Sequence, residues 1–147
     1  MTPEPLTPKR LTQADFNLLV NTPTGLFDTP VDPDSAWAFL TSPLHHMFMI
    51  VEDGVAVSFA SGTVLLHPDK APSMFINEVG TRDSHQRRGL AHRVTQALID
   101  HARATGCDGI WLATEPDNHA ARALYAKMGA QEQTIVGYAW DGAFDLD

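Results

Sequence analysis

One stretch of the chain, residues 78–91, constrains the fold more than any other. An apolar run that begins at Met74 passes through a polar turn, and a helical pattern starts at Gly89. A strand that leads through a turn into a helix presents unpaired N–H groups and the positive end of the helix dipole to solvent. Arg87 and Arg88 add two fixed positive charges in the turn. The stretch therefore predicts an anion-binding site, and a phosphate group is the expected anion.

Length and composition predict one compact domain, residues 1–147, with a core of its own. No apolar run approaches the roughly 18 residues that would cross a membrane. The proline-rich first ten residues lack the basic-then-apolar pattern of a signal peptide, so a cytoplasmic location without membrane contact is predicted. The lone Cys107 excludes an internal disulfide and is expected to be a small buried residue rather than a nucleophile.

The net charge of −8 comes from 18 acidic and 10 basic residues. This balance argues against a nucleic-acid partner and favours a cationic one, although solubility alone also explains it. Four arginines at positions 82, 87, 88 and 93 gather around the turn and predict a basic site within an acidic protein. The seven histidines show no metal-ligand spacing, so no metal is expected.

Hydrophobic periodicity predicts a meander of strands followed by strand, helix, strand, helix and strand, which is a mixed α/β or α+β layer. The proline-rich arm of residues 1–10 is expected to lead into a first strand. Further strands are predicted at residues 46–52, 55–66, 74–81, 110–113 and 135–140, and helices at 36–41, 89–105 and 118–128. An earlier short helix is expected to carry Phe16, Leu19 and Val20. Thr12 is the expected N-cap of the first helix, and Asp34 or Ser35 that of the second. Asp53-Gly54 predicts a tight hairpin turn.

The long segment 21–35 contains three prolines and three aspartates, so it is predicted to be a loop. Such an acidic loop either receives a cation or is simply solvated, and both interpretations stay open.

The turn belongs to neither of two common phosphate-binding classes, because it lacks both G-x-G-x-x-G and G-K-[ST]. Gln86-Arg87-Arg88-Gly89-Leu90-Ala91 instead fits the pattern Q/R-x-x-G-x-G/A. Gly89 lets the backbone approach a diphosphate closely, and Ala91 keeps the next helical turn free of bulk.

With these residues in view, residues 74–140 resemble the acetyl-CoA-binding core of the GNAT N-acetyltransferases. Three features carry the resemblance in the same order: an acid on a strand (Glu78), the loop of residues 86–91, and a segment from Asn118 to Gly129 that is similar to N-x-x-A-x-x-x-Y-x-K-x-G. The resemblance implies a GNAT fold, with a mixed, mostly antiparallel central sheet, splayed fourth and fifth strands, and about four flanking helices.

The resemblance also implies acetyl-CoA as the acetyl donor and assigns residues to it. The pantetheine arm would lie against Val79, Gly80 and Thr81. The pyrophosphate would lie against Gln86, Arg87, Arg88, Gly89, Leu90 and Ala91. The other side of the cofactor would be lined by Asn118, Ala121 and Tyr125.

Acetyl transfer to an amine needs a group that accepts a proton, and Glu78 is the candidate, acting directly or through a water. Its apolar neighbours Ile76 and Val79 are expected to raise the pKa of the carboxyl. A role in binding substrate charge and a purely structural role remain the alternatives. Tyr125 is the candidate proton donor to the departing thiolate, with a core aromatic as its alternative.

Among such enzymes the chain most resembles the aminoglycoside 3-N-acetyltransferases. The cues are the acidic segment Asp32-Pro-Asp34-Ser35, the Asp53-Gly54 hairpin, the run Ser-His-Gln-Arg-Arg-Gly-Leu-Ala, and Tyr138-Ala-Trp140-Asp141. The resemblance implies direct acetylation of the 3-amino group of an aminoglycoside antibiotic, and hence antibiotic resistance. A polycationic aminosugar favours a cleft ringed by carboxylates, for which the candidates are Asp28, Asp32, Glu78, Glu115, Asp117 and Asp141.

Two alternatives stay open. One is an enzyme that acts on a small metabolite amine or on a protein N-terminus. The other is an acyl-CoA-binding module without turnover. The sequence also leaves open whether the protein forms a homodimer.

Overall fold

The structure is a computed structural model that describes residues 6–144. It contains two compact units, Met1–Ala113 and Thr114–Asp147, which are described separately. Half of the predicted N-terminal arm, residues 1–5, lies outside the described residues. Between residues 6 and 144 no helix is long and apolar enough to cross a membrane.

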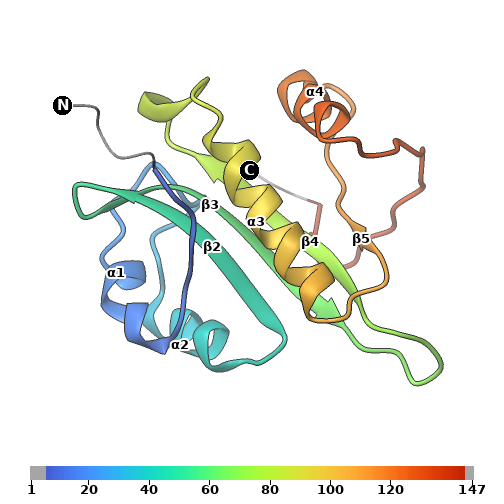
Figure 1. Cartoon of the computed structure of the whole chain (residues 1–147), viewed down its shortest axis with the longest axis horizontal. Coiled ribbons are helices and arrows are strands. Elements are labelled where there is room, and N and C mark those ends of the chain that lie inside the picture. Colours follow the sequence, from blue (N-terminus) through green and yellow to red (C-terminus); the bar gives the residue numbers. More distant parts are fainter. Residues whose placement is uncertain (1–5, 145–147) are drawn as a thin grey trace. The chain divides into compact units, whose positions relative to one another are not determined.

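The first unit is built on a five-stranded sheet with the strand order β1-β2-β3-β4-β5 (Figure 1). The strands are β1 (Lys9–Arg10), β2 (His45–Glu52), β3 (Val55–Leu65), β4 (Ser73–Thr81) and β5 (Ile110–Trp111). Neighbouring strands are antiparallel except β4 and β5, which are parallel. These strands confirm the predicted meander and place the predicted strand 110–113 at the edge of the sheet, shortened to two residues.

The helices of the first unit are α1 (Phe16–Val20), α2 (Pro33–Thr41) and α3 (Leu90–Ala104), with short 3-10 turns η1 (Gln13–Asp15) and η2 (Asp83–His85). Thr12 caps η1 in a reciprocal capping box with Asp15, as its sequence position predicts. Helix α2 begins earlier than predicted. Pro33 is well suited to a first helical turn, so the cap moves to Asp32, whose side chain accepts a hydrogen bond from Ser35 N–H.

Two apolar clusters lie on opposite faces of the sheet, because alternate residues of a strand point to opposite sides. On β2, Ile50 packs in the cluster that includes Val94 and Leu98 of α3. Its neighbour Met49 packs in the cluster that α1 and α2 cover. Helix α3 therefore covers one face, and α1 and α2 cover part of the other. Cys107 is partly buried against the α3 cluster, and burial raises the pKa of its thiol, which agrees with a packing role.

The Asp53-Gly54 turn joins β2 to β3 as predicted, with left-handed φ angles of 52° and 79° at its two residues. Such angles give a two-residue hairpin the same twist as its strands.

The side chain of Arg82 holds the loop that follows α1. The guanidinium of Arg82, directly after β4, donates to the carbonyl oxygens of Pro23, Thr24 and Ala56 at 2.7–2.8 Å.

The last strand of the sheet diverges from its neighbour. In the described part of the chain, β5 pairs with β4 only through Met74 with Ile110 and Phe75 with Trp111. Strand β4 continues to Thr81 without this neighbour. The splayed fourth and fifth strands of the predicted fold are therefore present.

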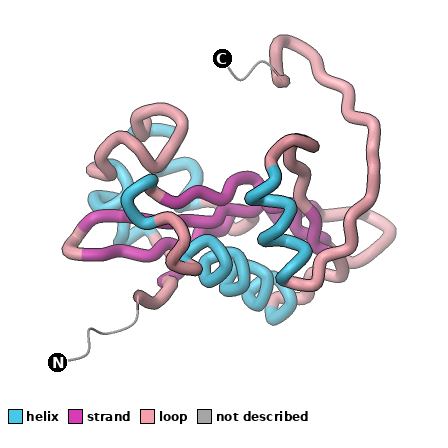
Figure 2. Tube along the Cα trace, turned by 90° about the horizontal axis from the view of Figure 1, so that it is seen from above, coloured by secondary structure: helices cyan, strands magenta, loops and turns pink. Residues whose placement is uncertain are grey.

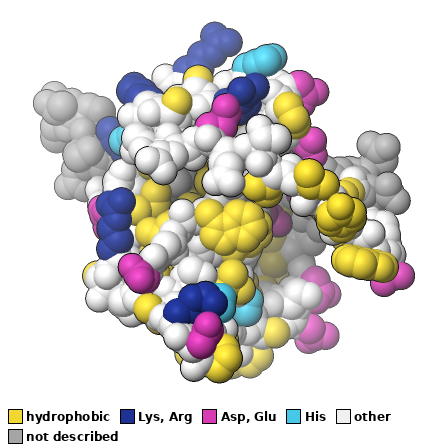
Figure 3. All heavy atoms as spheres, turned by 90° about the vertical axis from the view of Figure 1, so that its right-hand side faces the viewer, with side chains coloured by type: hydrophobic (Ala, Val, Ile, Leu, Met, Phe, Trp, Pro, Cys, Tyr) yellow, Lys and Arg dark blue, Asp and Glu magenta, His cyan; other side chains and the backbone are white. Residues whose placement is uncertain are grey.

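The second unit contains helix α4 (His119–Lys127), which confirms the predicted helix, and a long segment after it. The predicted strand at residues 135–140 is wrong for this structure, because these residues form loop and turn (Figure 2). A strand needs a neighbour to satisfy its backbone hydrogen bonds, and the described part of this unit contains no other strand. The alternating apolar residues that suggested a strand are instead exposed, with Val136 at 78%, Tyr138 at 79% and Trp140 at 77%. Exposed apolar side chains appear as yellow spheres in Figure 3.

Candidate active site

A bulge in β4 decides where Glu78 points. In the pairing of β4 with β3, Ile76 lies opposite Gly62 and Glu78 lies opposite Ser61, so Asn77 is an extra residue on β4. The Asn77 side chain is held by Thr63, with Asn77 Nδ2 donating to Thr63 Oγ1 at 2.8 Å. Without the bulge, Glu78 would share the α3 face with Ile76. The extra residue turns Glu78 to the other face, the side of the loop that follows α1.

On that face a second carboxylate lies near Glu78. Partial burial raises the pKa of Glu78, and the negative charge of Asp28 raises that pKa further. Apolar residues on both sides of Asp28 anchor its loop, since Leu26, Phe27 and Val31 pack against the α1 and α2 cluster. The structure thus brings together two of the predicted site carboxylates and shifts the pKa of Glu78 in the direction that the sequence predicted.

The turn between β4 and α3 has the backbone of an anion-binding site. Arg87 and Gly89 both adopt left-handed φ angles, 63° and 75°. Left-handed residues alternating with ordinary ones turn successive N–H groups toward a common point, and the first turn of α3 adds its own free N–H groups. A Cβ on Gly89 would meet nothing within 4 Å, so the backbone there is open to a close ligand. The residues of this loop, Gln86 to Ala91, therefore fit a diphosphate.

Two of the four arginines around this loop are engaged with backbone carbonyl groups. Arg82 is bound to three carbonyl oxygens of the first unit, as described above. Arg93 donates to the carbonyl oxygen of Leu6 at 3.0 Å. Both side chains are used within the fold, which leaves Arg87 and Arg88 as the arginines of the loop itself. Arg82 and Arg93 keep their positive charges in these contacts, so the predicted basic character of the site stays a prediction.

Sequence reasoning missed one group at the loop, the carboxylate of Glu52 at the end of β2. One oxygen lies 2.8 Å from His85 Nε2, and the other lies 3.6 Å from a guanidinium nitrogen of Arg88. The hydrogen bond from His85, with a smaller contribution from the charge of Arg88, lowers the pKa of Glu52. The sequence signal was weak, because Glu52 is 33 residues from His85 and only the hairpin and the sheet bring the two together.

The one other predicted substrate residue of the first unit, Asp32, is engaged locally. The Asp32 carboxylate caps α2, and the hydrogen bond from Ser35 N–H lowers its pKa. Its role in substrate binding stays a prediction.

In the second unit, Asn118 caps α4, and its side-chain oxygen accepts a hydrogen bond from Ala121 N–H at 3.1 Å. Tyr125 lies one turn further along, and burial raises the pKa of its hydroxyl, so the group keeps its proton at neutral pH. The side chains of Glu115, Asp117 and Asp141 are exposed. Because the two units are described separately, the assignment of these residues to one site with Glu78 stays a prediction.

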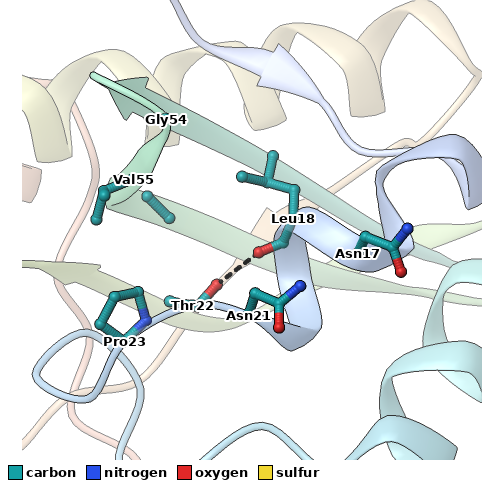
Figure 4. A pocket seen from close by; sticks show the side chains of 8 residues that line it. Asn17, Leu18, Asn21, Thr22, Pro23, Gly54 and Val55 are labelled. Carbon is teal, nitrogen blue, oxygen red and sulfur yellow. Dashed lines mark hydrogen bonds between the residues drawn. The ribbon is translucent and has the colours of Figure 1, made fainter.

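A cavity of about 300 Å³ lies apart from these residues, between α1 and the β2–β3 hairpin (Figure 4). The residues that line it are Asn17, Leu18, Asn21, Thr22, Pro23, Gly54, Val55 and Ala56. None of them is among the residues that the sequence assigned to a donor or an acceptor. Among residues 6–144 no group of three or more histidine, cysteine or acidic side chains could hold a metal ion.

Comparison with known proteins identifies the family. The model of the acetyltransferase (GNAT) family matches residues 15–130 of this chain. The chain belongs to the acetyltransferase (GNAT) family. It is therefore an acyltransferase whose acetyl donor is acetyl-CoA.

Among curated GNAT proteins, the chain is similar to N-alpha-acetyltransferase RimI of Mycobacterium tuberculosis, with 31% identity over 130 residues, which cover 87% of this chain and 80% of that enzyme. It is also 33% identical to the ribosomal protein bS18-alanine N-acetyltransferase of Escherichia coli K12 over 88 residues, and these residues cover 60% of this chain and 56% of that enzyme.

Solved structures confirm the GNAT fold. An aminoglycoside acetyltransferase from an uncultured soil metagenomic sample, solved in complex with sisomicin, superimposes with a TM-score of 0.77 at 16% identity and covers 92% of this chain and 95% of that one. The aminoglycoside acetyltransferase AAC(6')-Iy, solved with a bisubstrate analogue, gives a TM-score of 0.76 at 19% identity, with coverage of 93% and 99%. At these identities the likeness establishes the fold alone.

Proposed function

We propose that this GNAT enzyme transfers the acetyl group of acetyl-CoA directly to a primary amine of a polycationic acceptor, and that the acceptor is an aminoglycoside acetylated at its 3-amino group. The observation that carries the proposal is the pair of carboxylates, Asp28 and Glu78, on the sheet face opposite α3. Two neighbouring carboxylates attract an acceptor that carries several ammonium groups. We propose that the other candidate carboxylates add to the negative charge around this pair; they are Asp32, Glu115, Asp117 and Asp141.

In the proposed mechanism Glu78 accepts the proton of the attacking amine, directly or through a water. An ammonium group has no free electron pair, so the amine must lose a proton before or during attack. Burial and the charge of Asp28 raise the pKa of Glu78 and make it a better proton acceptor at working pH than an ordinary glutamate. The same carboxylate pair thus serves both attraction of the acceptor and its deprotonation.

The donor is proposed to bind through the loop Gln86–Ala91, with its pyrophosphate on the backbone N–H groups and on Arg87 and Arg88. When bound, it supplies an activated thioester. Backbone groups of Val79, Gly80 and Thr81 are proposed to hold its pantetheine arm, where β4 pairs with β3 on one side and no longer with β5 on the other. Asn118 and Ala121 are proposed to contact the donor from the second unit, and Tyr125 to protonate the leaving thiolate, because it keeps its own proton at neutral pH. We propose that both units together form one catalytic domain.

The test is thiol release from acetyl-CoA with a panel of amines, including gentamicin-type and sisomicin-type aminoglycosides. We expect turnover with aminoglycosides, acetylation at the 3-amino group by NMR of the product, and increased resistance in an expressing host. Glu78→Gln should lower kcat by about 100-fold or more, because a positioned general base contributes about 100- to 10,000-fold. Absence of thiol release with every aminoglycoside would exclude this acceptor. Equal kcat for Glu78→Gln and wild type would exclude the role of Glu78.

A second acceptor, the N-terminal amine of a protein, is favoured by the similarity to RimI. The same assay distinguishes it, with peptides that begin with alanine or with other small residues as substrates. Thiol release with such peptides and none with aminoglycosides would establish this alternative.

A further inference from the structure

A chain of three polar side chains connects the end of strand β2 to the turn that precedes α3. Ser84 Oγ lies 2.7 Å from His85 Nδ1, and His85 Nε2 lies 2.8 Å from Glu52 Oε1. With Nε2 protonated, His85 donates to the Glu52 carboxylate and accepts from the Ser84 hydroxyl. His85 and Glu52 are partly shielded from water, with side-chain exposures of 16% and 33%. A hydrogen bond to a charged group in such a place is stronger than one at a fully exposed site.

The second oxygen of Glu52 faces the loop itself. It lies 3.6 Å from Nη2 of Arg88, so one carboxylate contacts both the residue before the loop and a residue within it. This carboxylate belongs to the sheet, because Glu52 is the last residue of the eight-residue strand β2 and directly precedes the Asp53-Gly54 turn.

The loop needs such an anchor. Arg87 holds a left-handed φ of 63°, which costs free energy for a residue with a side chain. Within the turn, the side-chain Nε2 of Gln86 donates to Asp83 Oδ1 at 3.2 Å, a local contact between two residues of the turn itself. The pairing with Glu52 instead connects the turn to the sheet.

We propose that Glu52 and His85 are positioning residues of the donor site: His85 fixes the approach to the Gln86–Ala91 loop, and Glu52 fixes the Arg88 guanidinium, so that the loop is preorganised for the diphosphate of acetyl-CoA. This inference rests on the proposed assignment of that loop to the pyrophosphate. Neither residue touches the reacting atoms in this role. They act on donor binding, because a loop that is already in its binding conformation loses less entropy when the ligand binds.

The variants separate the two contacts. Glu52→Ala and His85→Leu remove the contact between β2 and His85. Glu52→Gln keeps an acceptor for His85 and removes the charge that faces Arg88. His85→Gln keeps an N–H donor near the position of Nε2. Asp69→Ala is the matched control, since Asp69 is a surface carboxylate with one ion pair, to Lys70 at 3.3 Å.

Two donors separate loop positioning from general damage: acetyl-CoA, and S-acetylpantetheine, which lacks the pyrophosphate. Glu52→Ala and His85→Leu should raise KM for acetyl-CoA about tenfold, the size expected for losing a hydrogen bond to a charged group, and leave kcat within about twofold. The kcat/KM for S-acetylpantetheine should stay unchanged. His85→Gln should recover most of the lost affinity, Glu52→Gln should lie between wild type and Glu52→Ala, and Asp69→Ala should match wild type.

Arg87→Ala serves as the reference for the loop assignment. Arg87→Ala could raise KM for acetyl-CoA without affecting S-acetylpantetheine. If it does and the Glu52 and His85 variants do not, the positioning role is overturned while the loop assignment stands. If Arg87→Ala affects both donors equally, the loop assignment fails, and this inference fails with it. Equal losses on both donors in Glu52→Gln and His85→Gln, the two mildest variants, would also overturn the positioning role. Thermal unfolding of each variant shows which losses come from a less stable fold.

Discussion

At the residue scale, the proposed acceptor site on the sheet face opposite α3 depends on one carboxylate and its surroundings. Glu78 lies on a strand that is otherwise largely apolar, and the Asn77 bulge directs it toward the loop that carries Asp28. Burial raises the pKa of Glu78 first, and Asp28 adds to the effect. Replacing Asp28 therefore tests the electrostatics of the pair without altering the proposed base.

We predict that Asp28→Asn shifts the acid limb of the pH profile of kcat to lower pH. The sign follows from the pair: Glu78 works as a carboxylate, a neutral neighbour no longer opposes its ionisation, and its pKa falls, so that activity persists at lower pH. The measurement is the thiol-release rate at saturating donor and acceptor as a function of pH. Asp69→Asn, which removes a surface charge elsewhere, should leave the limb in place. A limb that stays fixed or moves to higher pH in Asp28→Asn would show that Asp28 does not act on the catalytic group.

At the scale of secondary-structure elements, the first unit depends on close packing between neighbouring strands and between α3 and the sheet. Gly62 on β3 lies where the bulge brings β4 close. A Cβ at this position would meet Met74 Sδ at 2.8 Å and the Phe75 carbonyl oxygen at 3.2 Å. Met74 is fully buried and cannot move aside into solvent. On the α3 side, the rings of His46 of β2 and His101 of α3 pack in a tilted arrangement, with centroids 4.8 Å apart and planes at 60°.

We predict that Gly62→Ala lowers the free energy of unfolding by about 1–3 kcal/mol, the usual cost of overpacking a core. Gly109→Ala is the matched control, because nothing lies within 4 Å of its Cβ position and its φ is not left-handed. Urea unfolding followed by circular dichroism compares the two. Equal midpoints for the two variants would mean that the strands can separate at Gly62 without cost.

We also predict that the histidine pair makes the fold sensitive to acid. Burial lowers the pKa of His101, and the charge of Arg10 lowers it further. Burial lowers the pKa of His46 as well, followed by the charges of His101, Arg10 and His45, while a backbone hydrogen bond with Pro43 opposes the shift. The unfolded chain then binds protons at higher pH than the folded one. Stability is fully present above the ordinary histidine pKa of about 6.5 and is lost as the pH falls below it toward the lowered values.

The test is the free energy of unfolding of wild type and His101→Phe between about pH 7 and about pH 5. The variant should lose less stability on acidification, because one of the two partly buried imidazoles is gone and the other no longer faces it. His92→Phe makes the same change elsewhere on α3 and should keep the acid sensitivity of wild type. Parallel pH dependences for wild type and His101→Phe would contradict the assignment.

At the scale of the whole molecule, charge is distributed unevenly. The chain carries a net charge of −8, yet two arginines stand in the loop proposed for the donor. The proposed acceptor binds to an acidic protein through its own positive charges. The strength of that attraction depends on the number of charges on the acceptor and on ionic strength.

We predict that KM for an aminoglycoside with several ammonium groups rises steeply with salt, between about 0.05 and about 0.3 M, while KM for an acceptor with one amine rises little. Initial rates at fixed, saturating acetyl-CoA measure both. Mannitol at equal osmolality controls for effects of solute other than charge. Identical salt dependences for the two acceptors would show that the acidic surface serves solubility and not recognition.

Much of the region proposed to bind the donor could be predicted from the sequence, because its sequence signals are local. A strand, a turn with Gly89 and an amphipathic helix appear in order along the chain, and helix periodicity and glycine conformation need no knowledge of distant residues. The Asp53-Gly54 turn and the Thr12 cap were predictable for the same reason. The strand expected at residues 135–140 failed because alternation shows only that a segment suits a strand, whereas a neighbour decides whether it forms one.

By itself, then, the sequence determined the order of elements as far as α4, the turn before α3 that is proposed to bind a phosphate, and the identity of the candidate base. The tertiary structure alone decided which way that base points, because the bulge at Asn77 exists only in the pairing of β4 with β3. It also decided that Arg82 binds backbone carbonyls instead of a ligand, and that Glu52 meets His85 and Arg88 across the sheet. These outcomes depend on contacts between residues far apart in the chain, which no local pattern encodes.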